Sequence, residues 1–159
     1  MMMITTLKPN EVFVFGSNAQ GFHGAGSAGF AMRGDTRNNW RQDEAFKRAM
    51  KAPVGHPDRV GEWAIFGISR GIQKGYAGIS YAIQTLECAG QRRSTSRRDI
   101  CIQLINLWKS AKALPNLTFL MTPVGCGYSG YTPAEMSRTP RTQVHQILSC
   151  TSTAITPHY

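Results

Sequence analysis

Two glycine-rich segments of this chain each follow directly after a short apolar run. The first reads "VFVFGSNAQGFHGAGSAGFAMRGD" (residues 12–35) and the second "LTFLMTPVGCGYSGY" (residues 117–131). Short runs rich in Val, Leu and Phe are typical of buried strands. Because ligands of open α/β sheets bind at the carboxyl ends of the strands, the two segments predict an α/β fold in which both glycine loops lie at such ends.

Strand-like and helix-like segments alternate along the chain, which supports the α/β class. Strands are predicted at 11–15 and 117–124, the latter with few polar positions, as expected of a central strand covered on both faces. A short helix at 43–50 should end before Pro53, because proline disfavours helix in its predecessor. The other predicted elements are a helix at 27–34, a loop at 54–61, strands at 62–68 and 79–86, and a loop or hairpin at 69–78.

The clearest single element is a helix at 96–114. Ser96 and Asp99 resemble a capping box at its start, and Pro115 ends it. Apolar residues recur at helical spacing and predict one buried stripe. The stripe consists of Cys101, Leu104, Ile105, Trp108 and Ala111.

A length of 159 residues, 42% of them hydrophobic, predicts one globular domain. We assign this domain to residues 1–136 and treat 137–159, which lack acidic residues and a sustained period, as an irregular C-terminal extension. No run is apolar for the length of a membrane span, and the first residues lack the pattern of a secretory signal. A cytoplasmic protein is therefore expected, without membrane partners.

The cysteine and histidine positions predict no metal and no cofactor. The four cysteines form no C-x-x-C pair and match no zinc module, and the four histidines are far apart in sequence. We expect free thiols rather than disulfides.

The chain carries a net charge of +9, from 18 Lys and Arg against 9 Asp and Glu. A positive field attracts polyanions such as nucleotides, ADP-ribose chains and nucleic acid. Much of the charge lies in "GQRRSTSRR" (residues 90–98), which is interpreted as a solvated loop. A nucleic-acid-binding accessory role stays open, although no RNP motif, helix-turn-helix or zinc finger is present.

A glycine loop between a strand and a helix can hold a phosphate group. Glycine lets the backbone approach the anion, and successive amides and a helix N-terminus point at its oxygens. Two such loops predict a diphosphate held between them. Gly24, Gly26 and Gly29 also satisfy the dinucleotide pattern G-x-G-x-x-G, but eight residues separate Phe15 from Gly24. An NAD-dependent dehydrogenase is therefore a lower-ranked alternative.

Taken together, these segments resemble the macro domain family, including a phage and bacterial subgroup of short proteins. "FVFGSN" followed by "HGAGSAGFA" is similar to the family's first motif, an apolar strand ending in Asn and followed by a glycine loop and a helix. "PVGCGYSGY" (123–131) is similar to the second motif, which follows a long helix and an apolar strand. The resemblance covers residues 11–135 and implies a three-layer α/β/α fold with a mixed central sheet.

The resemblance also implies ADP-ribose or an ADP-ribosylated macromolecule as the ligand. Hydrolysis at the distal ribose is the expected reaction, either de-ADP-ribosylation or removal of a phosphate from that ribose. Asn18 would orient the ribose or a water, and His23 would assist as acid or base. Cys126 lacks a base fixed by motif and is not expected to act as a nucleophile. The implied ligand-binding residues are Gly16, Ser17, Gly24, Ala25, Gly26, Ser27, Gly125, Cys126, Gly127, Tyr128, Ser129, Gly130 and Tyr131.

The chain departs from the family pattern in ways that leave a second function open. It has no counterpart of the family's early Asp that holds the adenine, and neither glycine loop carries a carboxylate. A non-catalytic reader or sponge of ADP-ribose or of a related signalling nucleotide is therefore the main alternative to a hydrolase. Phe30 and Trp108 are expected in the core, and Tyr128 and Tyr131 fit packing as well as ligand contact.

Overall fold

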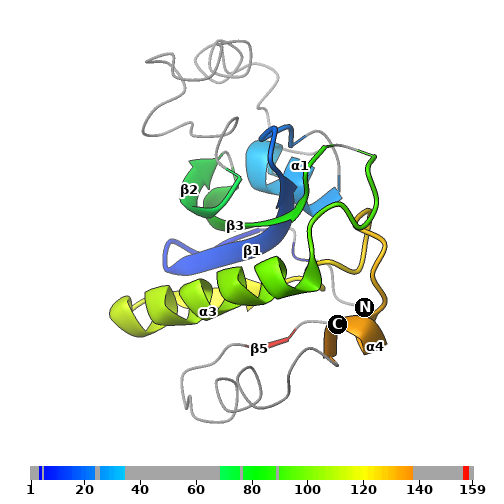
Figure 1. Cartoon of the computed structure of the whole chain (residues 1–159). Helices are drawn as coiled ribbons and strands as arrows, with labels where there is room; N and C mark the ends of the chain where they lie inside the picture. Colours follow the sequence, from blue (N-terminus) through cyan, green and yellow to red (C-terminus); the bar gives the residue numbers. More distant parts are fainter. Residues whose placement is uncertain are drawn as a thin grey trace.

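The computed structural model describes residues 4, 6–23, 26–34, 69–75, 77–88, 90–137 and 156–157 (Figure 1). Its helices and strands, in chain order, are β1 (Glu11–Asn18), α1 (Gly26–Arg33), β2 (Gly71–Gly75), β3 (Gly78–Leu86), α3 (Arg97–Ala113), β4 (Thr118–Met121), α4 (Pro133–Ser137) and β5 (Thr156–Pro157).

The strands form one mixed sheet in the order β2-β3-β1-β4-β5. β1 lies near the centre and runs parallel to both β3 and β4, so that Val14 stands beside Tyr81 on one side and Met121 on the other. β2 and β3 form a tight antiparallel hairpin closed by Gly75 and Gly78. The expected α/β class and mixed sheet are therefore confirmed.

The side chains of β1 alternate between two hydrophobic cores on opposite faces of the sheet, as the period of a strand requires. Val12 and Val14 pack with Ile100 and Leu107 of α3. On the other face, Phe13 and Phe15 pack with side chains of α1 and β3, among them Ala31 and Ala82. Figure 1 shows α1 and α3 on the two sides of the sheet. A central strand buried on both faces fixes the position of the loop that follows it.

The helix predicted at 96–114 is α3, and its cap is confirmed. The Ser96 side chain accepts a hydrogen bond from the Asp99 amide (3.1 Å) and donates one to the Asp99 carboxylate (2.8 Å). The predicted apolar stripe was correct at Leu104 and Ala111, which pack against the core, but the fully buried residues of α3 are Ile100, Gln103 and Leu107.

Gln103 explains part of this difference. Its side-chain amide accepts from the backbone N–H of Gln84 (2.7 Å) and donates to the carbonyl of Gln84 (2.9 Å). A polar residue therefore belongs to the buried face of the helix, which a count of apolar residues cannot detect. Trp108, expected in the core, is half-buried, and the Lys112 ammonium lies 4.3 Å from the centre of its ring.

The other predicted elements have mixed outcomes. The strands at 11–15 and 79–86 and the helix at 27–34 are present, and the strand predicted at 117–124 is present as the shorter β4. The segment 69–78 contains β2 and the turn of the hairpin that β2 forms with β3. The predicted helix at 43–50, loop at 54–61 and strand at 62–68 lie outside the described residues. At the far end of the chain, Thr156 and Pro157 pair with Leu120 and Met121 of β4. The domain boundary at residue 136 stays a prediction.

Candidate functional site

The two glycine loops leave the sheet from neighbouring parallel strands, β1 and β4. The second loop is fastened to β1 at its start, because Thr122 donates two hydrogen bonds to the carbonyl of Val14. One comes from its backbone N–H (3.2 Å) and one from its hydroxyl (2.9 Å). Parallel strands place their carboxyl ends at the same edge of a sheet, so both loops emerge there.

The side chain of Tyr128 joins the two loops. A Cβ built on Gly26, the first residue of α1, would stand 3.7 Å from Cε2 of Tyr128. Gly26 has a φ of 60°, a left-handed conformation that glycine adopts at no steric cost. The start of α1 and the tip of the second loop are therefore in contact, and Tyr128 remains three-quarters exposed at their junction.

Some backbone amides of the second loop hold the loop itself together. The amide of Cys126 donates to Pro123, that of Gly130 to Gly127, and that of Tyr131 to Gly125, at 3.0 to 3.1 Å. The three successive amides from 127 to 129 have no hydrogen-bond acceptor among the described residues. Consecutive unbonded amides at a turn form a concavity that can bind an anion.

The glycines of this loop differ in what they are needed for. Gly125 and Gly130 have φ values of 83° and 82°, so the loop requires glycine at both for its shape. Gly127 is not among the glycines with positive φ, and a Cβ there would meet nothing within 4 Å. Its missing side chain therefore leaves open space beside the unbonded amides.

Asn18, the residue predicted to hold the ribose, uses its side chain to close the first loop on itself. Its Nδ2 donates to the carbonyl of Phe22 (2.8 Å), and the amide of Phe22 donates to its Oδ1 (3.0 Å). Only 7% of Asn18 is exposed. The side-chain amide of Asn18, which was predicted to bind the ribose hydroxyls, is thus bonded to the backbone of a turn. This is a common role for Asn after a strand.

Gly16 and Ser17 lie within β1 rather than in the loop. A Cβ on Gly16 would stand 3.1 Å from the hydroxyl oxygen of Thr85 on β3, so the position requires a minimal side chain. Ser17 is buried, and its hydroxyl donates to the carbonyl of Ser69. Both residues belong to the strand that precedes the first loop, and the Ser17 hydroxyl is bonded to Ser69 rather than directed toward the loops.

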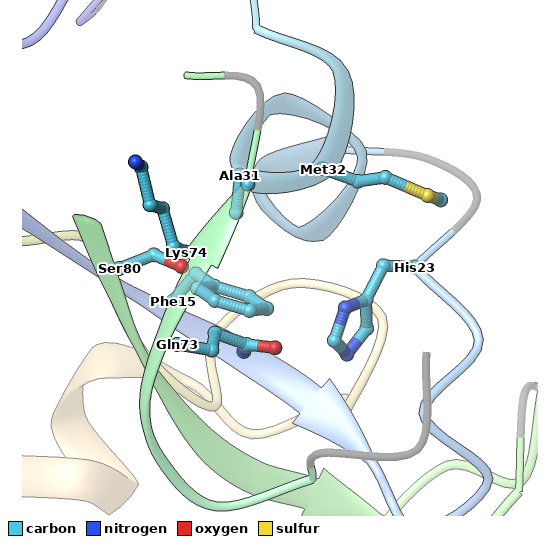
Figure 2. A pocket seen from close by; sticks show the side chains of 8 residues that line it. Phe15, His23, Ala31, Met32, Gln73, Lys74 and Ser80 are labelled. Carbon is cyan, nitrogen blue, oxygen red and sulfur yellow. The ribbon is translucent and has the colours of Figure 1, made fainter. Parts of the chain in front are cut away.

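His23 is buried in the core beneath α1. Its ring meets Phe15 edge-on at a centroid distance of 5.1 Å, and 1% of the residue is exposed. Figure 2 shows His23 and Gln73 pointing toward the same small space, beside Phe15 and under the helix. This space is too narrow to admit a water molecule. The structure therefore gives His23 a packing environment.

The other predicted residues of the first loop divide in two. Gly24 and Ala25 lie outside the described residues. Gly26 and Ser27 form the first turn of α1, where the backbone amides of a helix lack intrahelical acceptors and carry the positive end of its dipole. The amides of this turn are the donors that the first loop could offer to an anion.

The side chains of the second loop have separate environments. Tyr131 is buried, and its hydroxyl donates to the carbonyl of Thr95 (2.8 Å). Ser129 is buried too, whereas Tyr128 faces solvent. The thiol of Cys126 lies 3.8 Å from the carbonyl oxygen of Val124, and burial, followed by the charge of Glu135, raises its pKa. A thiol held protonated is a poor nucleophile.

The basic segment at 90–98 has a role that the sequence did not indicate. Most of the segment is exposed, as expected of a solvated loop, but it also packs on the second glycine loop, because the amide of Arg93 donates to the carbonyl of Ser129 (2.8 Å). The Arg93 guanidinium donates to both carboxylate oxygens of Glu135, at 2.9 and 3.1 Å. The density of arginines marked the segment as unusual but did not indicate this contact.

These features define a class, an α/β protein with two adjoining backbone loops at the carboxyl edge of parallel strands. No protein-family model matches the sequence, and neither a curated protein nor a solved structure matches it significantly. Within the described ranges, no group of three or more His, Cys, Asp or Glu side chains could hold a metal ion. None of the described helices is long and apolar enough to cross a membrane.

Proposed function

We propose that this chain is a macro-domain-like protein that binds ADP-ribose or a close derivative between its two glycine loops. One observation carries the proposal: the ring of Tyr128 lies against Gly26, next to three consecutive amides without acceptors among the described residues. The contact makes the loops two walls of one site rather than two separate turns.

A diphosphate matches the donors that the two walls offer. The first turn of α1 would face one phosphate, and the amides at 127–129 would face the other. The chain's net charge of +9 favours an anionic ligand. The adenosine and distal ribose of the ligand are assigned from the family resemblance of the two motifs.

The environments of Asn18 and His23 favour binding without hydrolysis. Both side chains are buried, one in a turn and one against Phe15. A general acid or base must come within hydrogen-bond reach of the reacting group. The Asn18 amide is bonded to Phe22 and His23 is only 1% exposed, so we propose a reader of ADP-ribose and rank a hydrolase second.

Calorimetric titration with ADP-ribose, AMP and NAD tests the binding proposal. ADP-ribose should bind more tightly than AMP, which lacks the second phosphate. In the Gly127→Ala variant the new methyl group would stand beside the unbonded amides and weaken ADP-ribose binding by about tenfold or more, as expected for the loss of charge-assisted hydrogen bonds. Equal affinity of wild type and Gly127→Ala would refute the site.

Turnover and salt dependence separate the two other functions. Release of ADP-ribose from a modified protein by the wild type, with loss of that activity in folded Asn18→Ala, would establish a hydrolase instead. Steeply salt-dependent binding to DNA or RNA that free ADP-ribose does not displace would favour the nucleic-acid-binding role.

A further inference from the structure

The arginines around the second glycine loop differ in how they are bonded. Arg93 is held by both carboxylate oxygens of Glu135 and by the carbonyl of Gly130 (3.2 Å), and Arg97 donates to the carbonyl of Glu135 (3.1 Å). The guanidinium of Arg92 has neither a hydrogen bond nor an ion pair with any described residue. Within the described part of the chain, its charge and its five donors are therefore not used by another residue.

The Arg92 guanidinium nevertheless has a defined position, because it lies directly against Gly130. A Cβ on Gly130 would stand 2.6 Å from Nε of Arg92 and 3.3 Å from its Cζ. No real Cβ makes a contact of 2.6 Å, so the guanidinium occupies the space that a side chain would fill. Gly130 also closes the turn whose amides at 127–129 have no described acceptor.

The segment that carries Arg92 is fixed by its neighbour. Arg93 has a φ of 58°, which is uncommon for a residue other than glycine, and its amide and side chain are bonded to Ser129, Gly130 and Glu135. Its guanidinium also lies 5.1 Å from the centre of the Tyr131 ring. These bonds hold the basic segment on the glycine loop, and among the described residues Arg93 has a carboxylate partner whereas Arg92 has none.

We propose that Arg92 is an anion-binding residue of this site and contacts the phosphate held by the second glycine loop. The inference rests on the proposed function for the identity of the ligand, but it concerns phosphate recognition as such. A guanidinium can bind two phosphate oxygens at once, which a backbone amide cannot. Arg92 thus makes the site selective for a charged phosphate over a neutral group of similar shape.

The test measures binding of inorganic pyrophosphate and of ADP-ribose to the wild type and to Arg92→Ala, Arg92→Lys and Lys109→Ala. Lys109 is exposed on α3, thirteen positions after the Ser96 cap, and its variant loses the same charge at a distance from the loop. We expect Arg92→Ala to raise the Kd of both ligands by about tenfold or more, the usual scale for a charged hydrogen bond. The Kd of Arg92→Lys should lie between those of the wild type and Arg92→Ala, and Lys109→Ala should bind like the wild type.

The two proposals fail in different ways. Unchanged affinity of Arg92→Ala for both ligands, or an equal loss in Lys109→Ala, would overturn the role of Arg92 while leaving the nucleotide site intact. Binding of pyrophosphate but not of ADP-ribose to the wild type would overturn the nucleotide proposal. The pyrophosphate affinity of Arg92→Ala would then still test the role of Arg92. Binding of neither ligand to the wild type would overturn both. Unchanged thermal unfolding of each variant controls for folding.

Discussion

The ring of Tyr128 lies against Gly26, with Cε2 3.7 Å from the place of a Cβ on that glycine. The two residues are 102 positions apart in the sequence. The contact exists because β1 and β4 are neighbours and parallel, so that their following loops turn toward the same edge. It joins the helix N-terminus of one loop to the unbonded amides of the other.

The role of Tyr128 in joining the loops can be measured by removing its ring. Because the side chain is 75% exposed, Tyr128→Ala should change the free energy of unfolding by no more than about 0.5 kcal/mol. Its affinity for ADP-ribose should fall about three- to tenfold, the range of an aromatic contact. Tyr128→Phe keeps the ring and should bind like the wild type; an equal loss in both variants would assign the effect to the hydroxyl.

Asn18 is predicted to act through stability. Asn18→Ala leaves the amide and carbonyl of Phe22 without their side-chain partners, which should lower the free energy of unfolding by about 1–3 kcal/mol. Urea unfolding followed by circular dichroism measures this loss. If the variant kept full stability but lost ADP-ribose binding, Asn18 would instead contact the ribose directly.

Gly75 lies at a close approach between α1 and β2. A Cβ there would stand 2.1 Å from the carbonyl oxygen of Ala31, a backbone atom that cannot rotate away. Gly75→Ala should therefore lower the free energy of unfolding by about 1–3 kcal/mol or more, the scale of overpacking. Gly127→Ala, whose Cβ meets open space, is the matched control in the same urea experiment. Equal stability of the two variants would contradict the close packing of α1.

Alkylation rates report on the Cys126 thiol. Its pKa is raised, first by burial and then by the carboxylate of Glu135, so the reactive thiolate is scarce near neutral pH. Iodoacetamide should modify Cys126 more slowly than a small free thiol at the same pH, as measured by mass spectrometry of the modified peptide. Glu135→Gln should speed the reaction only modestly, since burial is the larger cause. Rapid modification in the wild type would reopen a cysteine mechanism.

The pKa of Glu135 should be low. The Thr132 amide, which donates to its carboxylate at 2.7 Å, is the largest cause, and the Arg93 guanidinium is the next. A lowered carboxyl pKa contributes stability that is present above the ordinary value of about 4.3 and is lost as the pH falls through the lowered pKa. NMR titration of the carboxyl carbon should show this, and Arg93→Ala should raise the pKa partway. An unchanged pKa in that variant would contradict the ion pair.

Short sequence patterns predicted the helices and strands that depend on residues close together in the chain. The strand at 11–15 and the cap at Ser96 appear where expected, because apolar runs and capping residues act over a few positions. The stripe of α3 was only partly correct: Leu104 and Ala111 pack against the core, but the buried face also includes Gln103, which is bonded to Gln84, nineteen residues away. The sequence correctly predicted that the two glycine loops lie close together, whereas their role as a ligand site stays a prediction.

By itself, the sequence determined that this is an α/β protein with glycine loops after two of its strands, since periodicity and glycine content are local properties. Only the tertiary structure decided that the loops touch, that Asn18 and His23 are used internally, and that Arg92 lies on Gly130. These facts depend on the order of strands in the sheet and on contacts between residues distant in the chain. Such contacts form only when the whole chain folds, and no local sequence pattern predicts them.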